Sequence, residues 1–294
     1  MKHAYLLLVH TEFEVLQCLL RTLDDERNDV FIHFDRKVKT LPEVRMEHAG
    51  LYVLDERTDV RWGDLSVVEA EYRLYEAATA NGHYGYYHML SGVDLPLKTQ
   101  DEIHRFFDEH QGQEFIGYTL TTITPEVVRK AQRWHLFPRS FRNEHGLKRI
   151  VRAVFIRVQE AFGIRRNKEV AFKKGSQWCS LTDEAVRLVL ERKAWAMKTF
   201  SHTFCADEMF VHTIVWNSPL HDRIFCTTND GHGCMRAIGW QNGQLIDWAQ
   251  KDYEWLKQSE AMFARKFNSK DMPFIRQIAA LSDNDRTSPC HADE

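Results

Sequence analysis

Two adjacent carboxylates, Asp207 and Glu208, stand at the start of an apolar segment, residues 207–216, that is predicted to be a helix. A carboxylate at a helix N-terminus is favoured in its ionised form. It can then take the proton of a hydroxyl group that attacks an electrophilic carbon, which is general base catalysis. Acidic residues also cap helices routinely. Taken alone, these two residues favour a helix cap over a catalytic base.

Motifs for phosphate, metal or nucleophile chemistry are absent from the sequence. It has no G-x-x-x-x-G-K-[ST], G-x-G-x-x-G, H-E-x-x-H or G-x-S-x-G. Its Asp-x-Asp pair, Asp283 and Asp285, lies close to the C-terminus, whereas a pair that holds a divalent cation would need a rigid strand end. We therefore expect no divalent metal and no other cofactor.

The elements that must position any site alternate between strand and helix over the first 120 residues. Apolar runs predict strands, and helical periodicity predicts helices, one of them with Thr11 as its cap. This alternation is typical of an α/β fold with a mostly parallel central sheet flanked by helices. Ligands bind at the carboxyl ends of such strands, where His10, Asp35 and Asp94 stand. The predicted strands are 4–9, 30–34, 51–54, 86–90 and 114–118, and the helices are 12–23, 65–80 and 100–110.

The second half of the chain is predicted to be an elaborated, mostly helical region with a strand at 175–181. No repeat or linker is found, so residues 1–281 are expected to form one domain. Its nucleotide-binding half is 1–120 and its acceptor and catalytic half is 121–281. The polar residues 282–294 are expected to form a flexible tail.

Charge is distributed unevenly along the chain. The whole sequence has 39 Lys+Arg and 42 Asp+Glu, a net charge of −3, which argues against a nucleic-acid-binding protein. Residues 129–174 hold 14 Lys/Arg and three Glu, a local balance of +11. They include an amphipathic stretch, 147–162. This stretch is either a helix packed on the domain with a solvated basic face, or a surface for peripheral contact with an anionic membrane or a lipid-linked acceptor.

The six cysteines and the apolar runs of the sequence indicate where in the cell the protein is expected. No pair forms C-x-x-C, and the N-terminus has no cleavage-site pattern, so reduced thiols and a cytoplasmic location are expected. No apolar run approaches the roughly 20 residues of a spanning helix. Peripheral contact at the inner face of the membrane stays open.

Six segments, in this order and spacing, resemble the Core-2/I-branching enzyme family, glycosyltransferase family 14. The resemblance implies a GT-A-type fold and an inverting transfer from a UDP-sugar to a glycan or glycolipid, without a divalent metal. It implies that Glu208 is the catalytic base, with Asp207 as the helix cap and orienter. Asp94 stands where most GT-A enzymes carry their Asp-x-Asp pair. The segments are FIHFD (31–35), RWGDLSVVEA (61–70), SGVDLPLK (91–98), GSQW (175–178), ADE (206–208) and FARKF (263–267).

On the donor side, the resemblance assigns Lys266 to the diphosphate. A leaving diphosphate develops negative charge, which fixed cations must stabilise when no metal is present. The family's second cation, an arginine, would fall near Gly243, where this chain has none, so the second cation is unassigned, with Arg236 and Arg265 as candidates. For the UDP, the resemblance implies Val9, His10, Asp35 and Trp62, although Trp62 could equally be a core anchor.

On the acceptor side, the chain departs from the family. Trp240 matches an acceptor-contacting Trp, and Trp178 could line the same cleft, but the neighbouring Tyr position is Asn242 and the acceptor-binding Glu position is Gly117. The expected activity is transfer of a sugar, N-acetylglucosamine being favoured, in bacterial surface polysaccharide synthesis. The alternatives are transfer from UDP-xylose or another UDP-hexose, or a non-catalytic nucleotide- or glycan-binding module.

Overall fold

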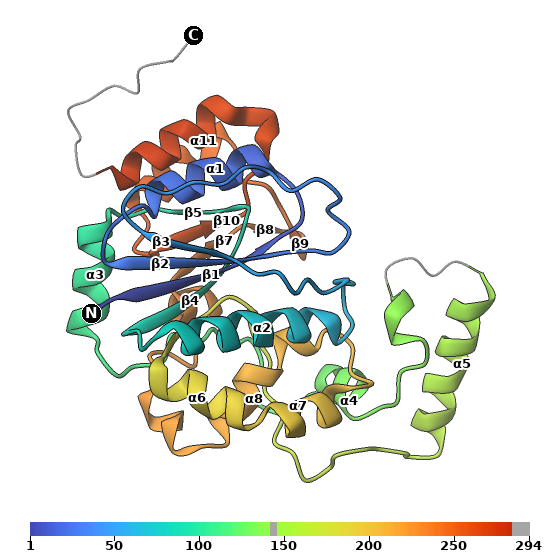
Figure 1. Cartoon of the computed structure of the whole chain (residues 1–294). Helices are drawn as coiled ribbons and strands as arrows, with labels where there is room; N and C mark the ends of the chain where they lie inside the picture. Colours follow the sequence, from blue (N-terminus) through green and yellow to red (C-terminus); the bar gives the residue numbers. More distant parts are fainter. Residues whose placement is uncertain (142–145, 284–294) are drawn as a thin grey trace.

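The computed structural model describes residues 1–141 and 146–283, and a five-stranded central sheet runs through them (Figure 1). The strand order is β3-β2-β1-β4-β6, and β6 alone of these pairs antiparallel. The first four strands in the chain confirm the predicted strands, and the mostly parallel α/β class is confirmed with them. The strands are β1 (His3–Val9), β2 (Asn28–Phe34), β3 (Gly50–Val53), β4 (Tyr86–Ser91) and β6 (Ser180–Thr182).

Helices cover both faces of this sheet, because successive side chains of a strand point to opposite faces. Tyr5 and Leu7 of β1 pack with α1 (Phe13–Thr22), α3 (Gln100–Glu109) and α11 (Met272–Ala279). Ala4 and Leu6 pack on the other face, where Figure 1 shows the second helical layer. That layer contains α2 (Ser66–Asn81), α6 (Asp183–Glu191) and α8 (Phe210–Trp216).

A three-stranded sheet joins the two halves of the chain. β10 (Phe263–Arg265) pairs antiparallel with β5 (Asp94–Pro96) and parallel with β7 (Arg236–Ile238). Residues near the C-terminus therefore lie directly beside the segment that follows β4. A hairpin of β8 (Trp240–Gln241) and β9 (Gln244–Leu245) turns through Asn242 and Gly243, which both have positive φ, as an Asn-Gly hairpin turn requires.

The second half is largely helical, as predicted. Besides α6 and α8, its described part carries five further helices before α11, of which Figure 1 shows α4 and α7 near the base of the molecule and α5 at its side. Short 3-10 turns connect them; η2 (Ala206–Glu208) contains the two carboxylates singled out above. The further helices are α4 (Pro125–Ala131), α5 (Leu147–Ala161), α7 (Lys193–Phe200), α9 (Asp230–Cys234) and α10 (Tyr253–Gln258).

Several local predictions were wrong. Residues 114–118 form isolated bridges, such as Glu114 with Ile224, instead of a strand, and of 175–181 only the last two residues belong to β6. Residues 114–118 are buried without a ladder of strand hydrogen bonds, and Ser176, Gln177 and Trp178 are only partly buried. Thr11 is not the cap of α1, because Glu12 occupies the N-cap with φ 57° and no side-chain cap bond forms.

The C-terminal boundary lies later than predicted. Ser282 is buried, and its hydroxyl donates to the carbonyl of Pro96 at 3.0 Å. The rest of the expected tail, 284–294, lies outside the described residues. The five cysteines in the described part of the chain are free thiols. Within that part, no helix is both long and apolar enough to cross a membrane.

Candidate active site

The carboxyl ends of three parallel strands meet at one edge of the central sheet. The amide of Asp35, which follows β2, donates to the carbonyl of Val9 at 2.8 Å, and the amide of Gly92, which follows β4, donates to that of Leu8 at 3.1 Å. His10 is exposed directly beyond Val9. Val9, His10 and Asp35, expected at the uridine, therefore lie together.

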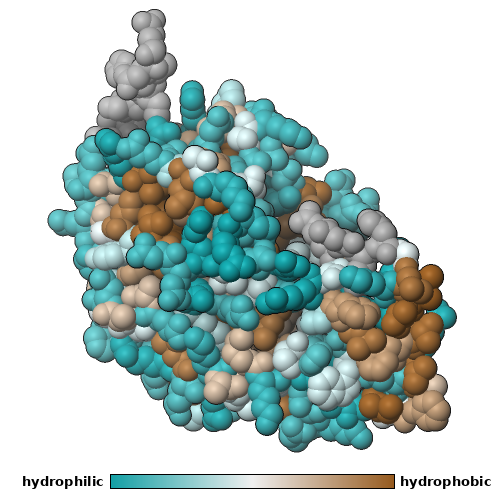
Figure 2. All heavy atoms as spheres, turned by 45° about the vertical axis from the view of Figure 1, so that its right-hand side comes forward, coloured by the Kyte–Doolittle hydropathy of each residue, from teal (hydrophilic) through white to brown (hydrophobic). Residues whose placement is uncertain are grey.

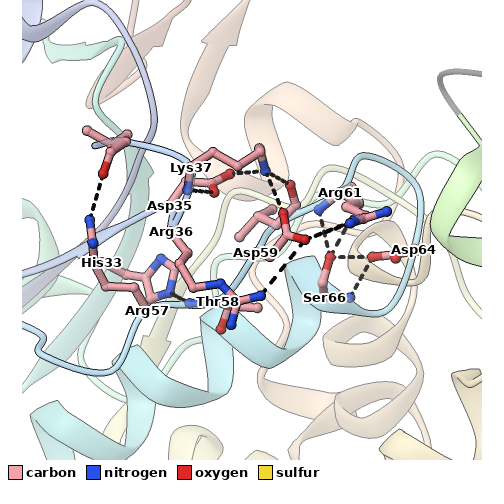
Figure 3. A network of polar contacts seen from close by, with 12 residues as sticks. His33, Asp35, Arg36, Lys37, Arg57, Thr58, Asp59, Arg61, Asp64 and Ser66 are labelled. Carbon is pink, nitrogen blue, oxygen red and sulfur yellow. Dashed lines mark hydrogen bonds and ion pairs between the residues drawn. The ribbon is translucent and has the colours of Figure 1, made fainter. Parts of the chain in front are cut away.

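The carboxylate of Asp35 is buried at this edge and pairs with a lysine (Figure 3). Its two oxygens accept from the amide of Lys37 at 2.9 Å and from Lys37 Nζ at 2.6 Å. Lys37 also pairs with Asp59 at 3.3 Å. The hydrogen bond from Arg61 is the largest cause that lowers the pKa of Asp59. Sequence analysis missed Lys37 and Asp59, because they lie in loops that show no periodicity.

A second cluster forms where β10 lies against β5. The guanidinium of Arg265 stacks on Trp178, 3.8 Å from the ring centroid, and lies 3.4 Å from Asp94 Oδ1. Asp94 also accepts from the amide and the hydroxyl of Ser91, at 2.9 and 2.7 Å. Burial lowers the pKa of Arg265, and the charge of Asp94 opposes that effect. Two expected cleft residues, Asp94 and Trp178, thus meet one of the candidate cations.

The other two candidate cations differ in exposure. Lys266 is partly exposed, and its Nζ lies 3.1 Å from Asp247 Oδ1. Arg236 is 2% exposed, and its guanidinium donates to two main-chain carbonyls at 2.7 and 3.1 Å. These bonds tie core segments together, although Arg236 also lines the large cavity described below. Arg265 is buried as well, so burial does not distinguish the two candidate arginines.

The helix-cap interpretation of Asp207 and Glu208 is wrong. Both residues lie in η2, and α8 begins only at Phe210, with Met209 as an N-cap that makes no side-chain cap bond. The chain enters η2 through Cys205, which has φ 54°. Met209 lies between the two carboxylates and α8, so neither of them caps the helix.

Glu208 forms ion pairs with two lysines from different segments. Its Oε2 lies 3.3 Å from Lys130 Nζ, on α4, and 3.3 Å from Lys174 Nζ. Its side chain is nevertheless 33% exposed. Burial lowers the pKa of Lys130, but nearby carboxylates, Glu208 first, outweigh burial and raise it. A carboxylate that is oriented on one side and open on the other can receive a proton from a bound hydroxyl.

Four consecutive residues, 175–178, connect Glu208 to the other clusters. The Gly175 amide donates to the Glu208 carbonyl at 3.0 Å. The Ser176 amide donates to Asp230 Oδ1 at 2.9 Å, and Gln177 Nε2 donates to Glu71 Oε1 at 2.7 Å. Trp178 lies beneath Arg265, as described above. Position 175 must be glycine, because a Cβ there would be 1.8 Å from the carbonyl oxygen of Gly117.

A buried pair of carboxylates, Glu71 of α2 and Asp207, lies next to Glu208. Burial and then the charge of Asp207 raise the pKa of Glu71 well above its ordinary value. Burial and then the charge of Glu208 raise the pKa of Asp207 to about 7. One oxygen of each carboxylate is buried without a hydrogen-bond partner. Such a pair favours the protonated form in the folded protein.

We expect the Asp207→Asn variant to show a changed dependence of stability on pH. Below pH 4 the raised pKa of Asp207 does not lower the free energy of unfolding, because the carboxyl group is protonated in both the folded and the unfolded protein. The cost then grows until about pH 7, where it reaches a few kcal/mol at most. The variant should therefore gain free energy of unfolding over the wild type at pH 8 and less at pH 5, measured by urea denaturation. Parallel pH profiles would contradict a protonated Asp207.

Trp62 packs against Phe204, two residues before the turn η2. Its side chain is 54% exposed, and the two rings meet at a steep angle with centroids 5.4 Å apart. The amide of Cys205 donates to the carbonyl of Gly63 at 2.9 Å, which fixes the two loops together. Trp62 is therefore an exposed ring and not a core anchor.

A cavity of about 920 Å³ is lined by Asp230 and by Trp240, which was expected to contact the acceptor. Burial raises the pKa of Asp230. The charge of Lys174 lowers this pKa and the charge of Glu208 raises it, so Lys174 and Glu208 are both close enough to Asp230 to interact with it electrostatically. A Cβ at Gly117 would be 2.2 Å from Asp230 Oδ1. Sequence analysis missed Asp230, since its proximity to Gly117 depends on tertiary packing. Among the described residues, no group of three or more His, Cys, Asp or Glu is placed to hold a metal ion.

A mostly parallel sheet with polar side chains at the ends of its strands is typical of folds that bind a ligand at that edge. The family model described as Branch: Core-2/I-Branching enzyme matches residues 3–273. The chain therefore belongs to the Core-2/I-Branching enzyme family.

Similar proteins carry two kinds of name. "Xylosyltransferase 2" of Rattus norvegicus is 23% identical over 90% of this chain and 32% of its own length. "N-acetyllactosaminide beta-1,6-N-acetylglucosaminyl-transferase" of Mus musculus is 22% identical over 97% of this chain and 73% of its own length. The chain thus spans about a third of the xylosyltransferase it matches.

Proposed function

We propose that this glycosyltransferase moves a sugar, with N-acetylglucosamine favoured, from a UDP-sugar to a hydroxyl of a glycan or glycolipid, inverting the anomeric centre without a divalent metal. The observation that carries the proposal is the position of Glu208. It is partly exposed, paired with Lys130 and Lys174, and joined through residues 175–178 to the cluster around Arg265. The family membership shows the reaction class, and this geometry supports the roles of the residues.

The proposed step is a single displacement. The acceptor oxygen attacks the anomeric carbon, and the bond from that carbon to the diphosphate oxygen breaks. The hydroxyl proton passes to the carboxylate of Glu208, and UDP leaves with the electron pair. Lys266 and Arg265 stabilise the charge that develops on the leaving diphosphate. Asp35 accepts a hydrogen bond from the nucleoside. Its two carboxylate oxygens accept this bond in addition to the bonds from the amide and Nζ of Lys37.

On the acceptor side, we propose that Asp230 supplies a carboxylate where the family pattern has Glu and this chain has Gly117. Asp230 lines the cavity together with Trp240 and occupies the space that a side chain at position 117 would enter. A carboxylate can accept hydrogen bonds from sugar hydroxyls, and an exposed indole can pack on a sugar face. Because the carboxylate comes from a different element, the acceptor is expected to differ from that of the animal enzymes.

A second donor, UDP-xylose, is favoured by one observation: several similar proteins are named xylosyltransferases. The proposed setting is bacterial surface polysaccharide synthesis in the cytoplasm. The free thiols of the described cysteines suit a reducing compartment.

The proposal predicts UDP release from UDP-N-acetylglucosamine in the presence of EDTA. Turnover should be unchanged by EDTA and not raised by Mn²⁺, because Lys266 and Arg265 take the place of a metal. The measurement is UDP production with UDP-N-acetylglucosamine, UDP-xylose and UDP-glucose, each with and without a panel of glycan acceptors.

Each result has a definite meaning. Faster release from UDP-xylose would identify the alternative donor. A requirement for Mn²⁺ would overturn the metal-free mechanism. If no UDP were released from any of the UDP-sugars, the result would favour the alternative, a non-catalytic binding module.

A further inference from the structure

Helix α5 carries an apolar face that the rest of the described chain does not cover. Figure 1 shows it at the side of the molecule, apart from the central sheet, and Figure 2 shows apolar side chains gathered at that end. Exposed fractions along this face are large, from 38% to 78%. The residues are Leu147, Ile150, Val151, Val154, Val158 and, just beyond the helix, Phe162.

The face is fixed outward by contacts on another side of the same helix. Ile156 and Gln159, three residues apart, are the buried residues of α5. The side chain of Gln159 accepts from the amide of Trp134 at 2.8 Å and donates to the carbonyl of Trp134 at 3.0 Å. Arg152 donates to the carbonyl of Leu136 at 3.1 Å. Residues at a spacing of three or four share a face, so the apolar stripe points away from this attachment.

Basic residues flank the apolar stripe. Lys148 and Arg157 are exposed at the two borders of the stripe, Arg149 lies by its spacing on the attached side, and Glu160 is the acidic residue of α5. Beyond the helix, Arg165 and Lys168 are exposed, together with Glu169. An apolar stripe bordered by Lys and Arg is complementary to the acyl chains and anionic headgroups at a membrane surface. A solvated basic face alone would leave the exposed Leu, Ile and Phe side chains without a role.

We infer that α5 is a docking surface for an anionic lipid bilayer, lying in the interface with its apolar stripe in the acyl boundary. The helix has 15 residues and an exposed, charged border, so it lies on the membrane and does not span it. This contact would hold the active site at the membrane, where a lipid-linked acceptor would be presented. That last consequence rests on the proposed function; the docking itself does not.

Sedimentation with lipid vesicles tests the inference without requiring enzyme activity. The protein should sediment with phosphatidylcholine vesicles that contain phosphatidylglycerol, should do so less at high salt, and should not sediment with phosphatidylcholine alone. The double variant Ile150→Ser, Val154→Ser should bind the anionic vesicles at least about tenfold more weakly than the wild type. Lys148→Gln with Arg157→Gln should weaken binding at low salt.

The matched control is Leu41→Ser with Val53→Ser, two exposed apolar residues far from α5 in the sequence, which should bind vesicles like the wild type. Three results would overturn the inference. They are no sedimentation with anionic vesicles, equal loss of binding in the control, and a lipid-free dimer in size-exclusion chromatography that the α5 apolar variant abolishes. The last result would assign the face to a second copy of the chain.

Discussion

The Glu208→Gln variant is expected to lose sugar transfer by about 100- to 10,000-fold in kcat, because glutamine cannot accept the proton of the acceptor hydroxyl. The KM for the UDP-sugar should change little, since Glu208 is proposed to act on the acceptor. The glutamine carbonyl can still accept hydrogen bonds from Lys130 and Lys174, so the local fold should persist. The measurement is steady-state kinetics, with the UDP-induced shift in Tm as the check on donor binding.

Glu126→Gln is the matched control for this prediction. Glu126 contacts the same two lysines, at 3.1 and 3.8 Å, and is 51% exposed. It shares the electrostatic surroundings of Glu208 without the proposed role, so its variant should keep turnover within a few-fold of the wild type. Equal turnover in the wild type and Glu208→Gln would reject the base assignment. Equal losses in both variants would show that the lysine pair, and not the base, is the sensitive element.

The Asp94→Ala variant is expected to lose about 3–5 kcal/mol in the free energy of unfolding, because it leaves a buried guanidinium without its carboxylate. The side chains of Asp94 and Arg265 are 1% and 10% exposed, and their ion pair is 3.4 Å long. The same substitution removes the acceptor for the amide and hydroxyl of Ser91. Urea denaturation followed by tryptophan fluorescence measures the loss.

An exposed ion pair provides the contrast. Glu76 pairs with Lys193, and their side chains are 47% and 39% exposed, so Glu76→Ala should cost less than about 1 kcal/mol. Adding Arg265→Met to Asp94→Ala should recover part of the lost stability, since no unpaired charge then remains buried. A loss below about 1 kcal/mol for Asp94→Ala alone would contradict the proposed coupling of Asp94 to Arg265.

The strands and the edge where they end could be predicted from sequence, because their signals are local. β1, β2, β3 and β4 are short apolar runs, and parallel strands bring their carboxyl ends to one edge. Asp35 and Val9 therefore met as expected. Residues 114–118 and most of 175–181 were also predicted to be strands but are not, since a short local pattern does not show whether a neighbouring strand is available for pairing.

The partners of the site residues could not be predicted in this way. Lys130 and Lys174 are separated from each other by more than forty residues, and no periodicity relates them to Glu208. Arg236 and Arg265 were equivalent candidates in the sequence, and only the pairing of β10 with both β5 and β7 shows what each of them contacts. That pairing buries Arg236 among main-chain carbonyls and sets Arg265 between Asp94 and Trp178.

Sequence by itself determined the fold class, the family resemblance and the amphipathic character of residues 147–162, because each follows from residue type and spacing along the chain. Only the tertiary structure decided that Glu208 lies outside the helix, that Asp230 fills the space beside Gly117, and that the apolar face of α5 points outward. These three features depend on how segments that are distant in the sequence cover one another's surfaces. Such packing cannot be read from the local sequence pattern.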